Sequence, residues 1–209
     1  LRSLVGSEMC IRDRNNMIAI IAEKPSVGMD IARVVGADTK NDGYCSGNGY
    51  MVTWALGHLV SLSLPDTYGY TRTAAEDLPM LPEPFRLVSR QVRTDRGMVP
   101  DLAATKQLKV IDGVFNRCVS IIVATDAGRE GELIFRWIYD YLGCTKPFRR
   151  LWISSLTDEA IRKGLEELKD GAEYDSLYAA ADSRAKADWL VGMNASRALT
   201  IASGTPNSS

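Results

Sequence analysis

The sequence predicts an α/β fold, in which a mostly parallel sheet is flanked by helices and followed by the start of an α-helical domain. Two apolar segments, residues 17–22 and 119–124, are typical of buried strands. A segment with helical spacing of its apolar residues follows each of them, and alternating strands and helices favour a parallel sheet. From residue 157 onward the pattern is helical only, which places a boundary near residue 155.

This interpretation divides the chain into three parts. Residues 1–16 show no periodicity and resemble translated sequencing-adapter sequence, so we expect a non-native leader that takes no part in the fold. Residues 17–155 form the α/β domain. Residues 156–209 begin a helical domain, and the small polar residues at its end suggest a truncation point.

The first half of the α/β domain opens with the strand at residues 17–22. A helix capped by Ser26 is expected next, and it should end at Gly36, because glycine readily adopts the left-handed conformation of a helix C-terminus. Residues 50–62 are rich in strand-forming residues. The prolines of residues 65–87 then indicate an irregular connector.

The second half repeats the alternation of helix and strand. Residues 101–116 have helical spacing, and residues 129–142 place their apolar side chains on one face of a further helix. A short strand is expected at residues 149–155. Thr157 or Asp158 would cap the first helix of the segment that follows.

Composition narrows the class of protein. With 45% hydrophobic and 24% charged residues, the chain has the balance of a soluble globular protein. No apolar run reaches the roughly 20 residues that span a bilayer, so we expect no membrane segment and a cytoplasmic location. Four well-separated cysteines and a single histidine argue against structural zinc or a disulfide framework. The net charge of −1 neither requires nor excludes a nucleic-acid partner.

Acidic residues follow both buried strands. Glu23 comes after the first strand and Asp126 after the second, while Glu130 lies in the first turn of the next helix. The carboxyl ends of parallel strands meet at one edge of a sheet, so the three side chains are expected to converge. Three oxygen ligands suit Mg²⁺ bound beside a phosphate. The same acids also suit a helix N-terminus, where negative charge interacts favourably with the helix dipole.

Further acidic, glycine and basic residues accompany these carboxylates. Glu132 lies about 200° around the helix from Glu130, which makes Glu130 the better ligand candidate. Gly128 and Gly131 permit a tight turn, and Arg129 could neutralise a phosphate. The stretch contains neither of the glycine patterns of nucleotide-binding loops, so no nucleotide cofactor is expected.

Five segments of the chain form an ordered set of motifs. In chain order they are "AEKPSVGMDIARVVG", "TWALGHLVSL", "ATDAGREGELIFRWI", "RLWISSLTDEAI" and "ADWLVGMNASRALT". Together they resemble the N-terminal part of the type IA DNA topoisomerases, and of bacterial topoisomerase III within that family. The resemblance extends from Met17 to Ala202, whereas the acidic segment alone would indicate only the wider Toprim superfamily of topoisomerases, primases and nucleases.

The resemblance implies a Toprim domain, a Rossmann-like α/β fold, followed by the helical domain that lines a groove for single-stranded DNA. It implies that Glu23 is a general acid and base near the scissile phosphate and a metal ligand, together with Asp126 and Glu130. Many relatives have aspartate where this chain has glycine at position 128. The resemblance therefore leaves open whether one or two Mg²⁺ ions bind. We predict Glu23, Lys24 and Arg129 as catalytic residues. Apart from the resemblance, Lys24 is either a phosphate clamp or a solvated lysine.

The helical pattern at residues 181–198 resembles the DNA-contacting helix of the family. Arg184 and Asp188 are one turn apart, so the carboxylate could aim the arginine at a phosphate. Arg197 is a second candidate for DNA binding. His58 either contacts DNA or is a hydrogen-bonded turn residue. Without the resemblance, this helix would be an ordinary amphipathic element with solvated arginines.

The implied activity changes DNA topology by transesterification. A tyrosine attacks a backbone phosphate, and the covalent link conserves the bond energy, so no ATP is needed. The tyrosine motif of the family belongs to a later domain, and the eight tyrosines here lie outside such a motif. We therefore expect a monomeric, nucleoid-associated chain that binds single-stranded DNA without relaxing supercoiled DNA. The alternatives are a metal-dependent Toprim nuclease or primase-like protein and a noncatalytic single-stranded nucleic-acid-binding module.

Overall fold

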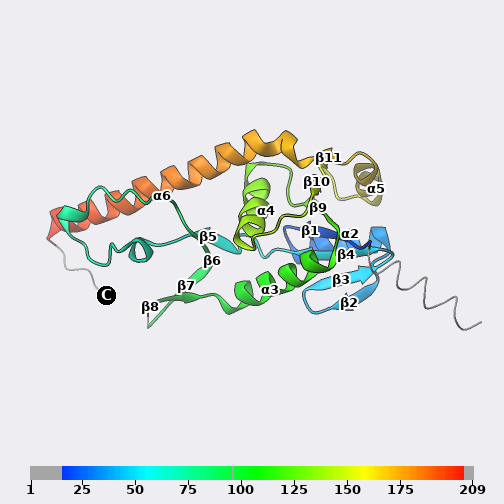
Figure 1. Ribbon diagram of the computed structural model, residues 1–209, viewed down its shortest axis with the longest axis horizontal. Helices are drawn as coiled ribbons and strands as arrows, with labels where there is room; N and C mark the ends of the chain where they lie inside the picture. Colours follow the sequence, from blue (N-terminus) through cyan, green and yellow to red (C-terminus); the bar gives the residue numbers. More distant parts are fainter. Residues whose placement is uncertain (1–15, 96, 205–209) are drawn as a thin grey trace, which may run out of the picture.

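The computed structural model describes residues 16–95 and 97–204, and a seven-stranded sheet with the strand order β11-β10-β9-β1-β4-β3-β2 forms its centre (Figure 1). Its four middle strands are parallel: β10 (Phe148–Arg150), β9 (Ser120–Ala124), β1 (Ile18–Ala22) and β4 (Tyr50–Trp54). Antiparallel strands complete both edges, and they are β3 (Tyr44–Gly47), β2 (Thr39–Asn41) and β11 (Lys169–Asp170). The predicted α/β class with a parallel core is confirmed.

The central strand β1 is buried on both faces. It pairs with β4 on one side and β9 on the other, and Ala22 lies directly beside Ala124 in the register with β9. Because successive side chains of a strand point to opposite faces, Ile20 packs in one apolar cluster and Ile21 in the other. Both isoleucines are fully buried, which explains why this segment is apolar without alternation.

Helices supply the apolar cover for both faces of the sheet. On the face toward Ile20 lie α2 (Pro25–Val35) and α5 (Asp158–Glu166), which also contact each other. The opposite face is covered by α3 (Leu102–Arg117) and α4 (Arg129–Tyr141), and α6 (Asp175–Ser203) packs in turn on α4. In Figure 1, α6 runs along the molecule well beyond the sheet. Within the described ranges, no helix combines the length and apolarity that a bilayer crossing requires.

Helix α2 begins earlier than its sequence suggests. The sequence predicts Ser26 as the N-cap, but the N-cap is Lys24, which has an extended backbone. Pro25 is the first residue of the helix. Proline suits that position because its fixed φ is already helical and its missing N–H has no partner there in any helix. At the other end, Gly36 has φ of 75° and closes the helix as predicted.

The connector between β4 and α3 is docked on α6. It contains short elements that begin with β5 (Val60–Leu62), and the others are η1 (Pro65–Tyr68), η2 (Ala75–Asp77), β6 (Leu87–Ser89), β7 (Gln91–Thr94) and β8 (Gly97–Pro100). Trp189 of α6 donates a hydrogen bond to the Ser63 carbonyl at 2.9 Å. Asn194 pairs with both backbone groups of Met80. The irregular backbone is thus satisfied by side chains of one long helix.

Two hairpins and one strand end differ from the sequence prediction. The pairs β2–β3 and β7–β8 are short antiparallel ribbons that the hydrophobic pattern did not reveal. Strands β2, β7 and β8 are largely exposed, so their side chains lack the apolar periodicity on which such a prediction depends. The strand expected at residues 149–155 ends at Arg150. The predicted leader falls almost wholly at residues 1–15, outside the described residues.

Candidate functional site

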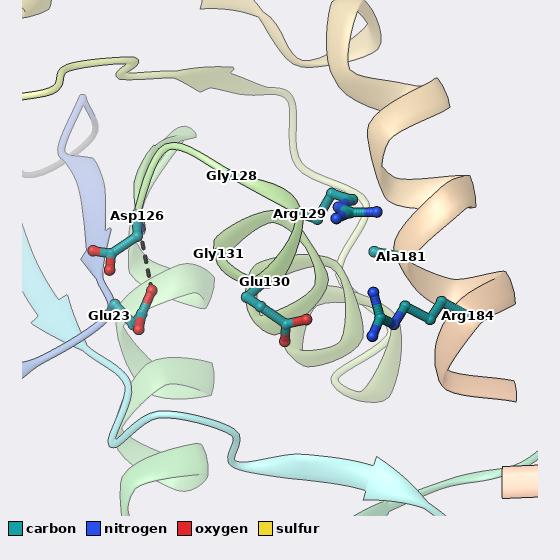
Figure 2. A pocket seen from close by; sticks show the side chains of 8 residues that line it. All are labelled: Glu23, Asp126, Gly128, Arg129, Glu130, Gly131, Ala181 and Arg184. Carbon is teal, nitrogen blue, oxygen red and sulfur yellow. Dashed lines mark hydrogen bonds between the residues drawn. The ribbon is translucent and has the colours of Figure 1, made fainter. Parts of the chain in front are cut away.

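The carboxyl ends of β1 and β9 bring two predicted acids together. Glu23 directly follows β1, and Asp126 follows β9 after one intervening residue. The backbone N–H of Asp126 donates a hydrogen bond to Glu23 Oε2 at 3.3 Å, as Figure 2 shows. Parallel pairing in register, Ala22 beside Ala124, is the cause of this proximity. The expected convergence of these two carboxylates is present in the structure.

A pocket of about 260 Å³ opens beside this pair. Its walls come from the end of β1, the loop after β9, the first turn of α4 and one face of α6 (Figure 2). The lining residues are Glu23, Asp126, Gly128, Arg129, Glu130, Gly131, Ala181 and Arg184. The pocket therefore combines three carboxylates with two guanidinium groups, a charge pattern suited to a phosphate accompanied by a cation.

Glu130 lines the same pocket but has a different partner. Its Oε2 lies 3.2 Å from His58 Nε2, and its side chain is 74% exposed. In Figure 2 this carboxylate points away from the other two, between them and Arg184. The imidazole of His58 also packs edge-on against Trp137, with ring centroids 6.2 Å apart. His58 thus stands at the acidic site as the neighbour of Glu130, a placement that its position in the sequence did not indicate.

The loop that presents Asp126 is folded tightly against α4. A Cβ atom at Gly131 would lie 2.1 Å from the carbonyl oxygen of Asp126, so only glycine permits this approach. The hydroxyl of Thr125 donates to the Gly131 carbonyl at 2.7 Å inside the fold. Gly128 differs, because its backbone is extended and a Cβ atom there would meet nothing within 4 Å. The tight turn predicted for both glycines therefore depends on Gly131.

The acids fit Mg²⁺ as a two-carboxylate site. Glu23 and Asp126 offer only oxygen donors, and Mg²⁺ commonly takes one or two carboxylates while it keeps several waters beside a substrate phosphate. Across residues 16–95 and 97–204, no group of three or more His, Cys, Asp or Glu side chains is close enough to enclose a metal. The three predicted ligands do not form one cluster, because Glu130 leaves the first turn of α4 toward His58.

Helix α6 contributes basic side chains at two very different places. Arg184 lines the pocket, and its Nε lies 3.7 Å from Asp188 Oδ2, one turn further along the helix. Both side chains are largely exposed. Arg197 lies near the other end of α6, where its guanidinium donates to the carbonyls of Tyr70 and Arg72 at 2.6 and 2.8 Å. Its donors hold the connector, so a role in DNA binding stays a prediction.

The remaining predicted catalytic residues occupy unequal positions. Arg129 is exposed, lines the pocket and begins α4. Lys24 is exposed at the start of α2 and is not among the residues that line the pocket. Both assignments stay predictions, and only Arg129 has the location that a phosphate contact in this pocket requires.

Sequence reasoning missed the buried charges behind the site. Glu132 and Arg150 are fully buried, with Arg150 Nε 3.0 Å from Glu132 Oε2. Arg150 also donates to the carbonyl of Asp126 at 2.8 Å. Helix geometry places Glu132 away from Glu130, and the structure shows that it faces the interior. The sequence did hint at the burial of Arg150, because in "RRLWISS" this arginine stands directly before an apolar run.

A second arginine supports the segment that carries His58. Arg90 donates to the carbonyls of Leu56 and His58, both at 3.1 Å. The same guanidinium binds Asp101, which caps the N-terminus of α3. The hydrogen bond from Arg90 lowers the pKa of the Asp101 carboxyl from its ordinary value. The cap of α3 and the backbone around His58 are therefore held by one side chain.

Comparison with known proteins gives a family match and a set of relatives. The Toprim domain model matches residues 18–156. DNA topoisomerase 3 of Shouchella clausii (strain KSM-K16) is 50% identical over 186 residues, which covers 87% of this chain and 24% of that protein. DNA topoisomerase 3 of Bacillus subtilis (strain 168) is 49% identical over 185 residues, with the same two coverages. The chain thus spans about a quarter of the length of these curated relatives.

Among solved structures, full-length topoisomerase I from Thermotoga maritima aligns with a TM-score of 0.46 and 17% sequence identity. The alignment covers 73% of this chain and 21% of the other.

Proposed function

The chain belongs to the Toprim domain family, and from that premise we propose that it is the N-terminal part of a type IA DNA topoisomerase. Such an enzyme cuts and rejoins single-stranded DNA by transesterification. The observation that carries the proposal is the pocket in which Glu23 and Asp126 face the arginines at the start of α4 and on α6. Identity of 49% to 51% with several bacterial DNA topoisomerases 3 supports it.

Glu23 is the proposed general acid and base. Its carboxylate follows a buried central strand and accepts a hydrogen bond from the Asp126 N–H, so it is held in the wall of the pocket. When a tyrosine phenolate attacks the scissile phosphate, the protonated carboxyl of Glu23 would donate its proton to the departing 3′ oxygen. On rejoining, the Glu23 carboxylate would take that proton back as the 3′ oxygen attacks the phosphotyrosine and the phenolate departs.

Glu23 and Asp126 are the proposed holders of Mg²⁺, with Glu130 beside them. When bound, the ion would offset negative charge and help to orient the phosphate for rejoining. Arg129 and Arg184 lie on the α6 side of the pocket in Figure 2, where their guanidinium groups could pair with DNA phosphates. Asp188 would restrict the conformation of Arg184 through their ion pair.

At the level of the whole protein, residues 17–155 would form the Toprim domain, and residues 156–209 would begin the helical domain of the DNA groove. The first part of that second segment still belongs to the sheet layer, because α5 covers one face of the sheet and β11 is its edge strand. The protein would bind single-stranded DNA. It would be a monomer associated with the nucleoid in the cytoplasm. We expect no relaxation of supercoiled DNA by this chain alone, because the attacking tyrosine of the proposed reaction belongs to another domain. Relaxation by the purified chain would contradict that expectation.

DNA binding tests this proposal through the arginine of the pocket. Binding of a fluorescent single-stranded oligonucleotide would be followed by anisotropy for the chain and for Arg184→Ala. Loss of one phosphate contact should weaken binding and reduce the slope of log affinity against log salt by about 0.7. Arg162→Ala, which removes an exposed arginine of α5, is the matched control and should change neither quantity. Equal affinity of the Arg184→Ala variant and the unmodified chain would contradict the proposed DNA path.

A further inference from the structure

A buried network of three charged side chains lies directly behind the pocket. Glu132 of α4 is fully buried and stands between two arginines. Its Oε1 accepts a hydrogen bond from Arg136 Nε at 2.9 Å, and its Oε2 lies 3.0 Å from Arg150 Nε. Arg150 is fully buried as well, at the end of β10. One oxygen of this carboxylate is hydrogen-bonded and the other lies within ion-pair distance of Arg150, and the carboxylate does not line the pocket.

Arg150 uses its remaining donors on the backbone that presents Asp126. Its Nη1 donates to the carbonyls of Val123 and Thr125 at 3.0 and 2.8 Å. Its Nη2 donates to the carbonyl of Asp126 at 2.8 Å. One guanidinium therefore binds the last part of β9 and the loop that follows it. The Asp126 N–H is in turn the hydrogen-bond donor to Glu23.

Arg136 extends the network toward the other wall of the pocket. Its Nη2 donates to the Gly171 carbonyl at 2.9 Å and to Asp175 Oδ1 at 2.6 Å. Asp175 is the first residue of α6, the helix that carries Arg184. A continuous chain of contacts thus connects the Asp126 loop, through Arg150, Glu132 and Arg136, to the start of α6.

Stability alone is a poor explanation for such a network. Moving charges out of water is costly, and an apolar replacement of a buried ion pair is often neutral or stabilising. Burial lowers the pKa of the Arg150 guanidinium, against the opposing effect of Glu132. An apolar residue could fill the space but could not bind three carbonyl groups at once.

We propose that Glu132 and Arg150 are positioning residues, which hold the Asp126 loop at a set distance from α6 so that the carboxylates and the arginines of the pocket face one another. The inference rests on the proposed function only in naming what the pocket binds. It separates the two glutamates of "REGE": Glu130 belongs to the pocket and Glu132 to its support.

Two variants distinguish positioning from simple stabilisation. Glu132→Gln leaves the buried arginines without their carboxylate. The double variant Glu132→Leu with Arg150→Met removes both charges, so folding should recover while the loop carbonyls lose their donors. Phe115→Leu, which shortens a buried side chain on the core face of α3, is the matched control for lowered stability away from the site.

Two readouts are followed: hydrogen exchange of the amides of residues 124–128, and Mg²⁺ affinity by calorimetry. Both Glu132→Gln and the double variant should exchange these amides faster and bind Mg²⁺ about tenfold more weakly. The Phe115→Leu control should retain both values. A double variant with the exchange and affinity of the unmodified chain, or one that does not fold, would overturn the inference. Absence of Mg²⁺ binding by the unmodified chain would count against the proposed function, and hydrogen exchange would still decide the inference.

Discussion

Gly131 is the residue on which the position of Asp126 depends most directly. Its Cα approaches the Asp126 backbone so closely that a Cβ atom would lie 2.1 Å from the carbonyl oxygen. At Gly128, three residues earlier, a side chain would meet nothing within 4 Å. The two glycines of one motif therefore have different roles, and the carboxylate site requires only the second to lack a side chain.

Gly131→Ala should destabilise the protein, although an alanine in a helix normally stabilises it. The methyl group would collide with backbone, and such overpacking costs about 1–3 kcal/mol. Gly192→Ala in α6 is the matched control, because open space surrounds that position and the change should stabilise by about 0.5–1 kcal/mol. Urea unfolding of both variants measures the two effects. A Gly131→Ala variant as stable as the Gly192→Ala variant would refute the close approach.

Some contacts of the site could be predicted from the sequence and others could not. Glu23 and Asp126 could be paired from sequence because each follows an apolar strand, and adjacent parallel strands bring their ends together. The partner of Glu130 could not be predicted, because His58 is 72 residues away and reaches the site through the connector. Arg150 was missed because its partners are mainly backbone carbonyls, which leave no trace in the pattern of side chains.

At the scale of elements, α3 and the β5–β6 region are joined through Arg90. The guanidinium binds Asp101, whose carboxylate also accepts the N–H groups of Ala103 and Ala104 at the start of the helix. Its other donors reach the carbonyls of Leu56 and His58. The start of α3 and the backbone beside the pocket are thus expected to loosen together.

Asp101→Asn should lower thermal stability in a pH-dependent way. Arg90 lowers the pKa of Asp101 in the folded protein, so the stabilisation is fully present above the unfolded value of about 3.8 and is lost as pH falls through the lower folded value. The difference in melting temperature between the variant and the unmodified chain should therefore be large at pH 7 and shrink toward pH 2. Circular dichroism at a series of pH values measures it, and a constant difference would contradict the assigned ion pair.

At the scale of the whole molecule, the sheet and α6 form two walls with the pocket between them. The parallel core of the sheet could be predicted because buried strands are apolar on both faces. The course of the connector could not be predicted. Its backbone is held by Trp189, Asn194 and Arg197, side chains that come more than a hundred residues later in the chain. Prolines indicate irregular structure without indicating what it packs against.

We propose that Glu23 and Asp126 together bind a divalent cation at the edge of the sheet. Calorimetric titration of Mg²⁺ into the chain, into Asp126→Asn and into Glu159→Gln tests it most directly, with the exposed carboxylate of α5 as control. We expect binding by the unmodified chain and by Glu159→Gln, and an affinity lower by at least about tenfold in Asp126→Asn. Equal binding by all three proteins, or none by the unmodified chain, would contradict the claim and favour a noncatalytic nucleic-acid-binding module.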